Sequence, residues 1–252
     1  MGKLNGRVAL VTGAAQGIGV VYAAALAAEG AKLVIADILD GSATADKINN
    51  AGGVAMSVHA DVSNAKSVEK MLAAAVDRFG GVDILVSNAA VYASLEMQPL
   101  TEIELDVWDK VMAVNVRGAF LCARAVIPVM RKQGYGRIIN IASGTPYKGT
   151  PFLLHYVTSK GAIIAMSRAI SREVGNDGIC VNTLCPGFVL SEGVIANKVL
   201  REKLTGPVLA SRAIKRDQFP EDLIGPLIFL ASDDCEFMTG QSVVVDGGSV
   251  NN

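Results

Sequence analysis

The sequence has few of the residues on which metal centres and disulfide frameworks depend. Among 252 residues there are four Cys, two His and one Trp, and aromatic residues make up only 5%. The cysteines (Cys122, Cys180, Cys185 and Cys235) show no C-x-x-C spacing, and two His are too few for a typical histidine-based metal site. We therefore expect no metal, and buried reduced thiols in place of disulfides.

Excess charge of either sign is also missing. The 23 Lys and Arg nearly balance 24 Asp and Glu, for a net charge of -1, and no basic run exceeds Lys215-Arg216. A chain with almost no net charge and no basic cluster lacks the positive electrostatic field that would attract nucleic acid or an anionic membrane. No apolar run reaches the roughly 18 residues of a membrane span, and the first six residues do not resemble a signal peptide. We expect a cytoplasmic protein.

What the chain does have is a regular alternation of two kinds of segment, with 51% hydrophobic residues overall. Short apolar runs predict strands over 7–12, 32–37, 54–60, 82–86, 137–142, 179–184 and 241–246. Helical patterns lie between them, over 17–29, 42–50, 64–79, 105–132 with a bend at Pro128, 156–175, and from Pro220 onward. Alternation of this type predicts an α/β fold, with a doubly wound parallel sheet covered by helices on both faces.

No linker or internal repeat interrupts this pattern, so residues 1–252 are interpreted as a single domain. The one long irregular segment is about 188–219. Segments of that length are usually functional lids or helical insertions, and we expect this one on the substrate side.

The spacing of Tyr156 and Lys160 indicates acid–base chemistry. Residues four apart share one face of a helix, so the phenol and the ammonium should lie side by side. A nearby cation favours the phenolate and lowers the tyrosine pKa from about 10 toward the working range. Ser143 follows the predicted strand 137–142, where its hydroxyl could steady a substrate oxygen. An exposed helix pair without function is the alternative interpretation of Tyr156 and Lys160 taken alone.

A glycine-rich loop, Thr12-Gly-Ala-Ala-Gln-Gly-Ile-Gly19, joins the first strand to the first helix. Small residues there let the backbone approach a pyrophosphate at the helix N-terminus. The candidate contacts are Gly13, Gln16, Gly17, Ile18 and Gly19. A tight turn that needs glycine only for its dihedral angles is the alternative.

Asp37 ends the second predicted strand, at about the distance where an acid binds the adenosine ribose of a dinucleotide. Its carboxylate would repel a 2′-phosphate. Ile38 follows it, and the glycine loop carries no Lys or Arg. These residues predict NAD over NADP, against the alternative of an aspartate in a surface turn.

With these motifs in this order, the chain resembles the classical short-chain dehydrogenase/reductase family over essentially its whole length. Further matching positions are Asp61-Val62, Asn88-Ala89, Asn115, Pro186-Gly187 and Val245-Asp-Gly-Gly248. The resemblance implies a Rossmann-type sheet of seven strands in the order 3-2-1-4-5-6-7, and a homotetramer.

The resemblance also implies roles for individual residues. Tyr156, Lys160, Ser143 and Asn115 would be catalytic, with Asn115 anchoring a water that links Lys160 to solvent. Further cofactor contacts are implied for Asp61, Val62, Asn88, Pro186, Gly187, Val189 and Ser191, while Tyr156 and Lys160 would contact the nicotinamide ribose. Two positions depart from the family pattern: Ala90 stands in place of a glycine, and Ser191 in place of a frequent threonine.

The combined interpretation is an NAD-dependent oxidoreductase, an alcohol dehydrogenase or ketoreductase, acting on a secondary alcohol or ketone. Apolar residues in the segments expected around the substrate, with Lys148 and Glu192 the main charges, favour a small neutral substrate with an aromatic or cyclic group. A 3-oxoacyl-thioester reductase is the alternative enzyme. A non-catalytic dinucleotide-binding regulator is the alternative of another class, although such proteins often lose the Tyr or the Lys that this chain keeps.

Overall fold

The computed structural model describes residues 2–250 and contains one parallel sheet of seven strands, in the order β3-β2-β1-β4-β5-β6-β7. This is the predicted order. The strands are β1 (Val8–Thr12), β2 (Lys32–Asp37), β3 (Val54–His59), β4 (Ile84–Ser87), β5 (Gly136–Ile141), β6 (Ile179–Pro186) and β7 (Ser242–Val245). Each predicted strand is present, with its ends within two residues of the expected positions.

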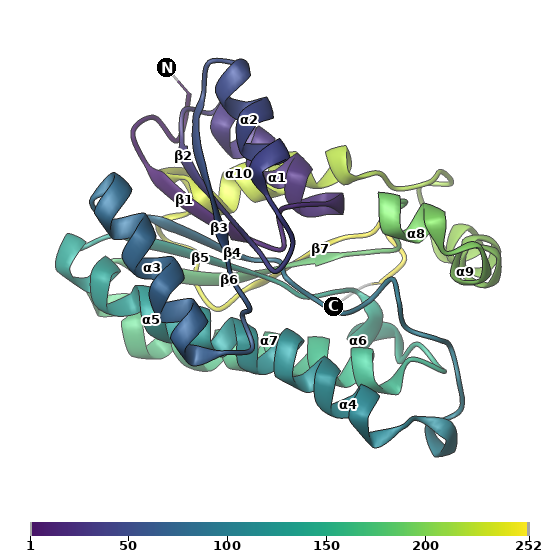
Figure 1. Ribbon diagram of the computed structural model, residues 1–252. Coiled ribbons are helices and arrows are strands. Elements are labelled where there is room, and N and C mark those ends of the chain that lie inside the picture. The colour runs from purple at the N-terminus through teal and green to yellow at the C-terminus, as the bar shows by residue number, and fades with distance from the viewer. Residues whose placement is uncertain (1, 251–252) are drawn as a thin grey trace.

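Helices cover both faces of this sheet (Figure 1). On one side lie α1 (Gly17–Ala28), α2 (Ser42–Asn50) and α10 (Ile224–Ala231). On the other side lie α3 (Ala65–Phe79), α4 (Leu105–Val111), α5 (Gly118–Gln133) and α7 (Leu154–Val174). The predicted doubly wound α/β fold is confirmed.

Alternate residues of the central strands fill two separate cores. In β1, Ala9 and Val11 pack in the core beneath α1 and α10, whereas Val8 and Leu10 pack in the core beneath α3 and α5. Side chains of a strand point alternately to opposite faces, so a strand that is buried on both faces must be apolar throughout. This is why the central strands are continuous apolar runs rather than alternating ones.

The predicted helix 105–132 is divided in the structure. A π-helical segment, η2 (Met112–Arg117), separates α4 from α5, while Pro128 lies inside α5 without ending it. Within residues 2–250, the continuous stretch Leu105–Gln133 is the one helix long and apolar enough to cross a membrane, although 44% of its most apolar window is buried. Because its inner face packs on α3 and on β4 and β5, the requirements of the core account for much of its hydropathy.

The irregular segment 188–219 is a helical insertion. It contains α8 (Glu192–Ala196) and α9 (Lys198–Ser211), which project beyond the sheet in Figure 1. The short helix α6 (Thr145–Lys148) lies between β5 and α7. These added elements stand at the carboxyl ends of the strands, where ligands of open α/β sheets bind.

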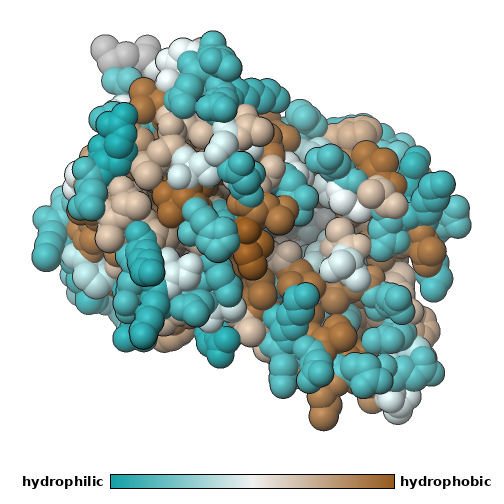
Figure 2. All heavy atoms as spheres, in the orientation of Figure 1, coloured by the Kyte–Doolittle hydropathy of each residue, from teal (hydrophilic) through white to brown (hydrophobic). Residues whose placement is uncertain are grey.

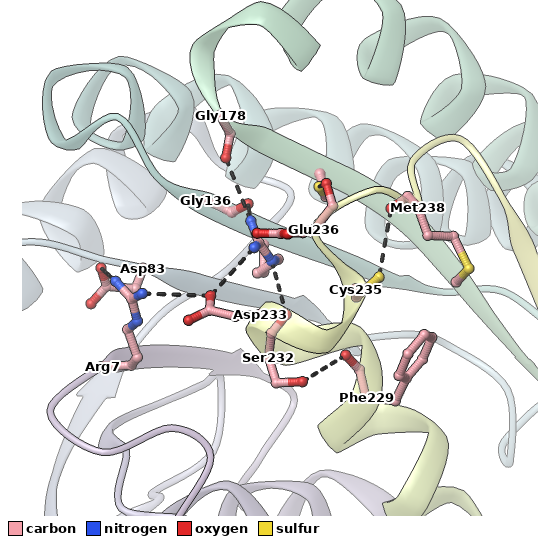
Figure 3. Close-up of polar contacts among 12 residues, drawn as sticks. Arg7, Asp83, Gly136, Gly178, Phe229, Ser232, Asp233, Cys235, Glu236 and Met238 are labelled. Carbon is pink, nitrogen blue, oxygen red and sulfur yellow. Dashed lines mark hydrogen bonds and ion pairs between the residues drawn. The ribbon is translucent and has the colours of Figure 1, made fainter.

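The opposite end of the sheet is closed by a polar cluster that includes Arg7, Asp83 and Asp233 (Figure 3), and Arg137 belongs to it. The Arg137 side chain is 4% exposed, donates to the Ser232 carbonyl at 3.1 Å and forms an ion pair with Asp233 at 3.4 Å. Arg7 contacts the same carboxylate at 3.6 Å and stacks over the Tyr135 ring. Cys235 lies beside this cluster, and all four cysteines are buried and unpaired. Within residues 2–250 no group of three potential metal ligands is found.

Candidate active site

The sheet changes winding direction between β1 and β4, and a cleft opens there at the carboxyl ends of the strands. The glycine loop forms one wall and depends on the absence of side chains. A Cβ at Gly13 would lie 2.7 Å from the Ala89 backbone, and one at Gly19 would overlap the Gly13 carbonyl oxygen. Gly13 also has φ of +66°, a conformation that L side chains rarely adopt. The loop is therefore folded tightly against the end of β4.

The N-terminus of α1 faces this cleft without a side-chain cap, because Gln16 stands at the capping position and makes no capping hydrogen bond. Uncapped N–H groups at a helix N-terminus suit the oxygens of a phosphate. The residues present therefore fit the pyrophosphate of a dinucleotide.

The loop is fastened to β4 by side chains. The Asn88 amide donates to the Thr12 and Gly13 carbonyls at 3.0 and 2.8 Å, and the Thr12 hydroxyl accepts from the Asn88 and Ala89 backbone N–H groups at 3.1 Å. The sequence interpretation assigned no role to Thr12. The available signal was a hydroxyl residue at the end of a buried strand, directly before the glycine loop.

Asp37 lies at the end of β2, 8% exposed, and lines the cleft. Its carboxylate accepts hydrogen bonds from the Ala15 and Leu39 backbone N–H groups at 2.9 and 3.0 Å. It therefore holds the glycine loop and keeps further acceptor capacity at the cleft wall. Ile38 beside it is 60% exposed.

The other predicted cofactor contacts gather around the same space. Those lining the cleft are Gly13, Gln16, Gly17, Ile18, Asp61, Val62, Asn88 and Ser191, and those lining the adjoining cavity include Pro186, Gly187 and Val189. Gly19 lies beneath the loop without lining either space. Ala90 lies between the two and lines both.

Ser143, Tyr156 and Lys160 share the adjoining cavity, whose volume is 920 Å³ including its open mouth. The exposed fractions of the three residues are 5%, 8% and 3%. The Lys160 ammonium lies 5.6 Å from the centre of the Tyr156 ring and donates to the Ile141 carbonyl at 2.7 Å. The spacing of four residues thus brings base and cation together, as predicted, beside the hydroxyl at the end of β5.

The electrostatics of this group differ from the expectation. Burial raises the pKa of Tyr156 above its ordinary value, as does Tyr92, while a hydrogen bond with Ser143 acts in the opposite direction. Burial also lowers the pKa of Lys160 to about 8. We expected the Lys160 ammonium to lower the pKa of Tyr156 toward neutrality; Lys160 is not among the groups that shift this pKa, and desolvation is the largest cause.

Tyr92 is a part of the site that carries no family motif. Its ring lies 4.5 Å from the Tyr156 ring, centre to centre, with the planes tilted by 37°. Aromatic pairs at this separation attract one another and restrict each other's motion. Tyr92 therefore fixes the Tyr156 ring from the side of the β4 loop.

Asn115, in the π-helical segment, connects that loop to α7. Its side chain is 2% exposed, accepts from the Val91 N–H at 2.8 Å and donates to the Ser159 hydroxyl at 3.1 Å. The extra residue of a π turn changes the direction in which a side chain points, which accounts for the division of the long helix at this position.

The substrate side of the cavity is mainly apolar. Beyond Tyr156 it is lined by Tyr92, Leu153, Phe188, Val194, Leu204 and Val208, and it continues into a groove between α9 and residues 148–152 that includes Phe152. On the face shown in Figure 2, hydrophobic residues gather along the hollow beside the α8–α9 segment. Tyr147 does not line this cavity and packs in a core cluster with Ile163 and Ile164.

Comparison with known proteins agrees with this geometry. The family model described as Enoyl-(Acyl carrier protein) reductase matches residues 13–250. The chain is 36% identical over 256 residues to the 3-oxoacyl-[acyl-carrier-protein] reductase of Synechocystis sp., covering 99% of each chain. It is 32% identical over 263 residues to the D-beta-hydroxybutyrate dehydrogenase of Rhizobium meliloti, covering 96% of this chain and 98% of the relative.

Solved structures give the same result. A candidate NAD(P)-dependent gluconate 5-dehydrogenase from Beutenbergia cavernae, solved with NADP at low occupancy, superposes with a TM-score of 0.90. The two chains are 34% identical, and the match covers 98% of each.

Proposed function

We propose that this chain, which belongs to the classical short-chain dehydrogenase/reductase family, interconverts a secondary alcohol and a ketone with NAD. Its membership establishes the coarser statement: it is an oxidoreductase of a family that uses a nicotinamide dinucleotide. The observation that carries the proposal is the presence of Ser143, Tyr156 and Lys160 in one cavity that adjoins the dinucleotide cleft.

The bound nicotinamide supplies or accepts the hydride. The chain's own residues handle the proton and the substrate oxygen. Because burial raises the pKa of Tyr156, the phenol is protonated at neutral pH in the absence of the cofactor, which suits donation of a proton to a ketone oxygen. In the reverse direction Tyr156 takes the alcohol proton, and the Ser143 hydroxyl holds the same oxygen by a hydrogen bond.

Two residues support Tyr156 in this role. Lys160, held by the Ile141 carbonyl, presents its positive charge on the same helix face and favours the phenolate. Asn115 is proposed as a positioning residue, since it joins α7 at Ser159 to the backbone of Val91.

For the cofactor we propose NAD over NADP. Asp37 is a buried carboxylate in the cleft, and Ile38 beside it offers no charge to a 2′-phosphate. Lys110 is the one cation among the described residues that line the cleft, and it comes from α4 rather than from the β2 turn. A phosphate beside Asp37 would be repelled without a nearby counter-charge.

For the substrate we propose a small molecule with an aromatic or cyclic group next to the reacting carbon. The support is the apolar lining between Tyr92 and Val208. An apolar pocket with a few convergent polar groups is the usual form of a site for such ligands.

The test is Tyr156→Phe, assayed with NADH on a panel of aromatic, cyclic and aliphatic ketones. Turnover should fall by about 10²- to 10⁴-fold, the usual contribution of one acid–base group, while NADH still binds. Retained turnover, or no turnover of any ketone by the unaltered chain, would contradict the proposal.

A second candidate, a 3-oxoacyl-thioester reductase, is favoured by one observation. Helix α9 carries Lys198, Arg201 and Lys203 beside the substrate groove, and an acyl carrier requires basic residues at the entrance. The relative named as such a reductase adds support. Turnover of an acetoacetyl thioester with NADPH exceeding that of the ketone panel with NADH would favour this reaction.

Association into a homotetramer remains a proposal. Leu105 and Phe120 on α4 and α5 are 77% and 46% exposed, and Phe237 is fully exposed. Exposed apolar side chains mark a contact surface where they join in one contiguous patch. Light scattering after size exclusion would test for the mass of four chains.

A further inference from the structure

The two spaces of the site differ in charge. The cofactor cleft is lined by Asp37, Asp61 and Glu192. Among the described residues that line the catalytic cavity and the groove beyond it there is no Asp or Glu, and the cations are Lys148, Lys160 and Lys203. The sequence indicated Lys148 and Glu192 as the main charges near the substrate, but Glu192 lines the cofactor cleft. The substrate side is therefore positive although the whole chain is not.

Lys148 stands where the cavity opens into the groove and lines both. Its ammonium donates to the hydroxyls of Ser211, at 3.2 Å, and of Ser249. Within residues 2–250 no carboxylate lies within 4.0 Å of it. An ammonium has three donors, so two neutral hydroxyls leave one donor free, and no opposite charge in the described part of the chain is in contact with it.

The other charged groups near Lys148 do not neutralise its positive charge by direct contact. Asp246 acts on it only from beyond 4.0 Å: its Oδ1 accepts from the Gly248 and Ser249 N–H groups at 3.0 Å, and its Oδ2 is buried without a hydrogen-bond partner among the described residues. Arg212 adds a second positive charge nearby. Partial burial lowers the pKa of Lys148, as expected for a cation without an acidic partner.

We propose that Lys148 binds an acidic group of the substrate, so that the physiological substrate is an anion whose apolar body joins a carboxylate to the reacting carbonyl or alcohol. This proposal rests on the proposed function, since it takes Ser143 and Tyr156 as the reacting end. It replaces the wholly neutral molecule suggested by the sequence.

The position of Lys148 limits the distance between the two ends of that substrate. Lys148 lies five positions after Ser143, the last four of them in α6, which at 1.5 Å per residue places the two backbones roughly 7.5 Å apart along the chain. A para-substituted aromatic ring, or a chain of similar length, spans such a distance. Apolar residues between the two ends, Leu153 and Val208 among them, suit the ring.

The experiment compares two probes that differ in the acidic group: 4-acetylbenzoate and its neutral counterpart 4-methylacetophenone. Dissociation constants for both are measured with the NADH-bound full chain, from the change in NADH fluorescence, and kcat/KM is measured in parallel. We expect the carboxylate to bind about tenfold more tightly, a value between that of an exposed ion pair and that of a buried charge-assisted hydrogen bond.

Variants test whether Lys148 causes the tighter binding of the carboxylate probe. In Lys148→Gln the ratio of the two dissociation constants should fall to about one, and Lys148→Arg should retain most of it. Lys203→Gln is the matched control: this lysine lines only the outer groove, and the ratio should stay within twofold. A loss of affinity for both probes alike in Lys148→Gln would show that Lys148 only fastens α6 to α9, and would overturn the proposal.

The two proposals fail separately. If both ketones are reduced but bind with equal affinity, the anion site is overturned and the reaction stands. If neither is reduced but the carboxylate preference depends on Lys148, the anion site stands and the proposed reaction fails.

Discussion

The cofactor cleft and the substrate cavity meet at Tyr156, yet they are built in different ways. The cleft is formed by residues at or directly after the ends of strands, such as Gly13 after β1, Asp37 at the end of β2 and Asn88 after β4, and hydrogen bonds between side chains and backbone hold them. The cavity is closed by α6, α8, α9 and the loop after β4, which side chains such as Lys148 and Asn197 connect. The ends of the strands therefore form the part of the site that serves the common reaction. The added helices and the loop after β4 form the part that selects the substrate.

The largest effect is expected where the cleft recognises the adenosine end. Asp37→Ala combined with Ile38→Arg removes the charge that repels a 2′-phosphate and adds one that binds it. The ratio of kcat/KM for NAD to that for NADP should fall by about 100-fold or more, since two charge-assisted contacts change.

Asp37→Asn is the control for that variant, because it removes the charge but keeps the size of the side chain, and its single amide oxygen can still accept from one of the Ala15 and Leu39 N–H groups. It should give a smaller change in the same direction. An unchanged preference in the double variant would show that the cleft does not select NAD through Asp37.

A smaller effect is expected at Asn115, which joins the two regions. Asn115→Ala leaves the Val91 N–H and the Ser159 hydroxyl without their partner, so the free energy of unfolding should fall by about 2 to 3 kcal/mol. Turnover should fall as well, because Val91 and Ser159 flank Tyr92 and Tyr156. Urea unfolding measures the first effect.

Ser159→Ala removes the hydrogen bond from Asn115 and the local one to the Tyr156 carbonyl but keeps the contact between Asn115 and Val91, so it should cost less than Asn115→Ala. If Asn115→Ala unfolds with the same free energy as the unaltered chain, the Asn115 side chain does not hold the loop after β4 against α7.

A still smaller effect is expected at Tyr92, whose ring contacts the Tyr156 ring from the substrate side. Tyr92 raises the pKa of Tyr156, so Tyr92→Phe should lower it. For alcohol oxidation, where the phenolate is required, the acidic limb of the kcat/KM profile should move to lower pH by about half a unit, under 1 kcal/mol at 1.36 kcal/mol per unit.

Tyr92→Leu separates the effect of the hydroxyl from that of the ring. It removes the aromatic contact at 4.5 Å too, and should lower kcat in addition to shifting the profile. A profile that moves to higher pH in Tyr92→Phe would contradict the assignment.

The smallest effect is expected from an ion pair between Arg216 and Asp222, which fixes the end of the helical insertion. The Arg216 guanidinium hydrogen-bonds the Asp222 carboxylate at 2.6 Å and lowers its pKa from 3.8 to about 2. A lowered pKa stabilises the fold above the unfolded value, and this contribution is lost as pH falls from about 4 to about 2. Because Arg216 is 57% exposed, the contribution should stay below about 1 kcal/mol.

Asp222→Asn should therefore be less stable than the unaltered chain at pH 6, and the difference in the free energy of unfolding should shrink toward pH 3. Arg216→Gln removes the same ion pair and should show a similar loss. A difference for Asp222→Asn that does not vary with pH would mean that the pair contributes nothing.

The sequence allowed the fold and the reacting group to be predicted because both depend on local patterns. Continuous apolar runs are what strands buried on both faces require, and a spacing of four residues places Tyr156 and Lys160 on one helix face whatever surrounds them. Gly13 directly follows a strand and Asp37 ends one, so the order of the strands alone brings them together.

The sequence by itself therefore determined the parallel sheet, the glycine loop and the pairing of a phenol with a cation. Only the tertiary structure decided which side chains face the substrate. Tyr147 packs in a core cluster, and Glu192 lines the cofactor cleft. Lys148 lies at the mouth of the cavity without an acidic partner among residues 2–250 in contact with it. The tertiary structure also decided the protonation of Tyr156, whose pKa is raised by burial. Burial and the neighbours of a charge come from segments distant along the chain, and no local pattern encodes them.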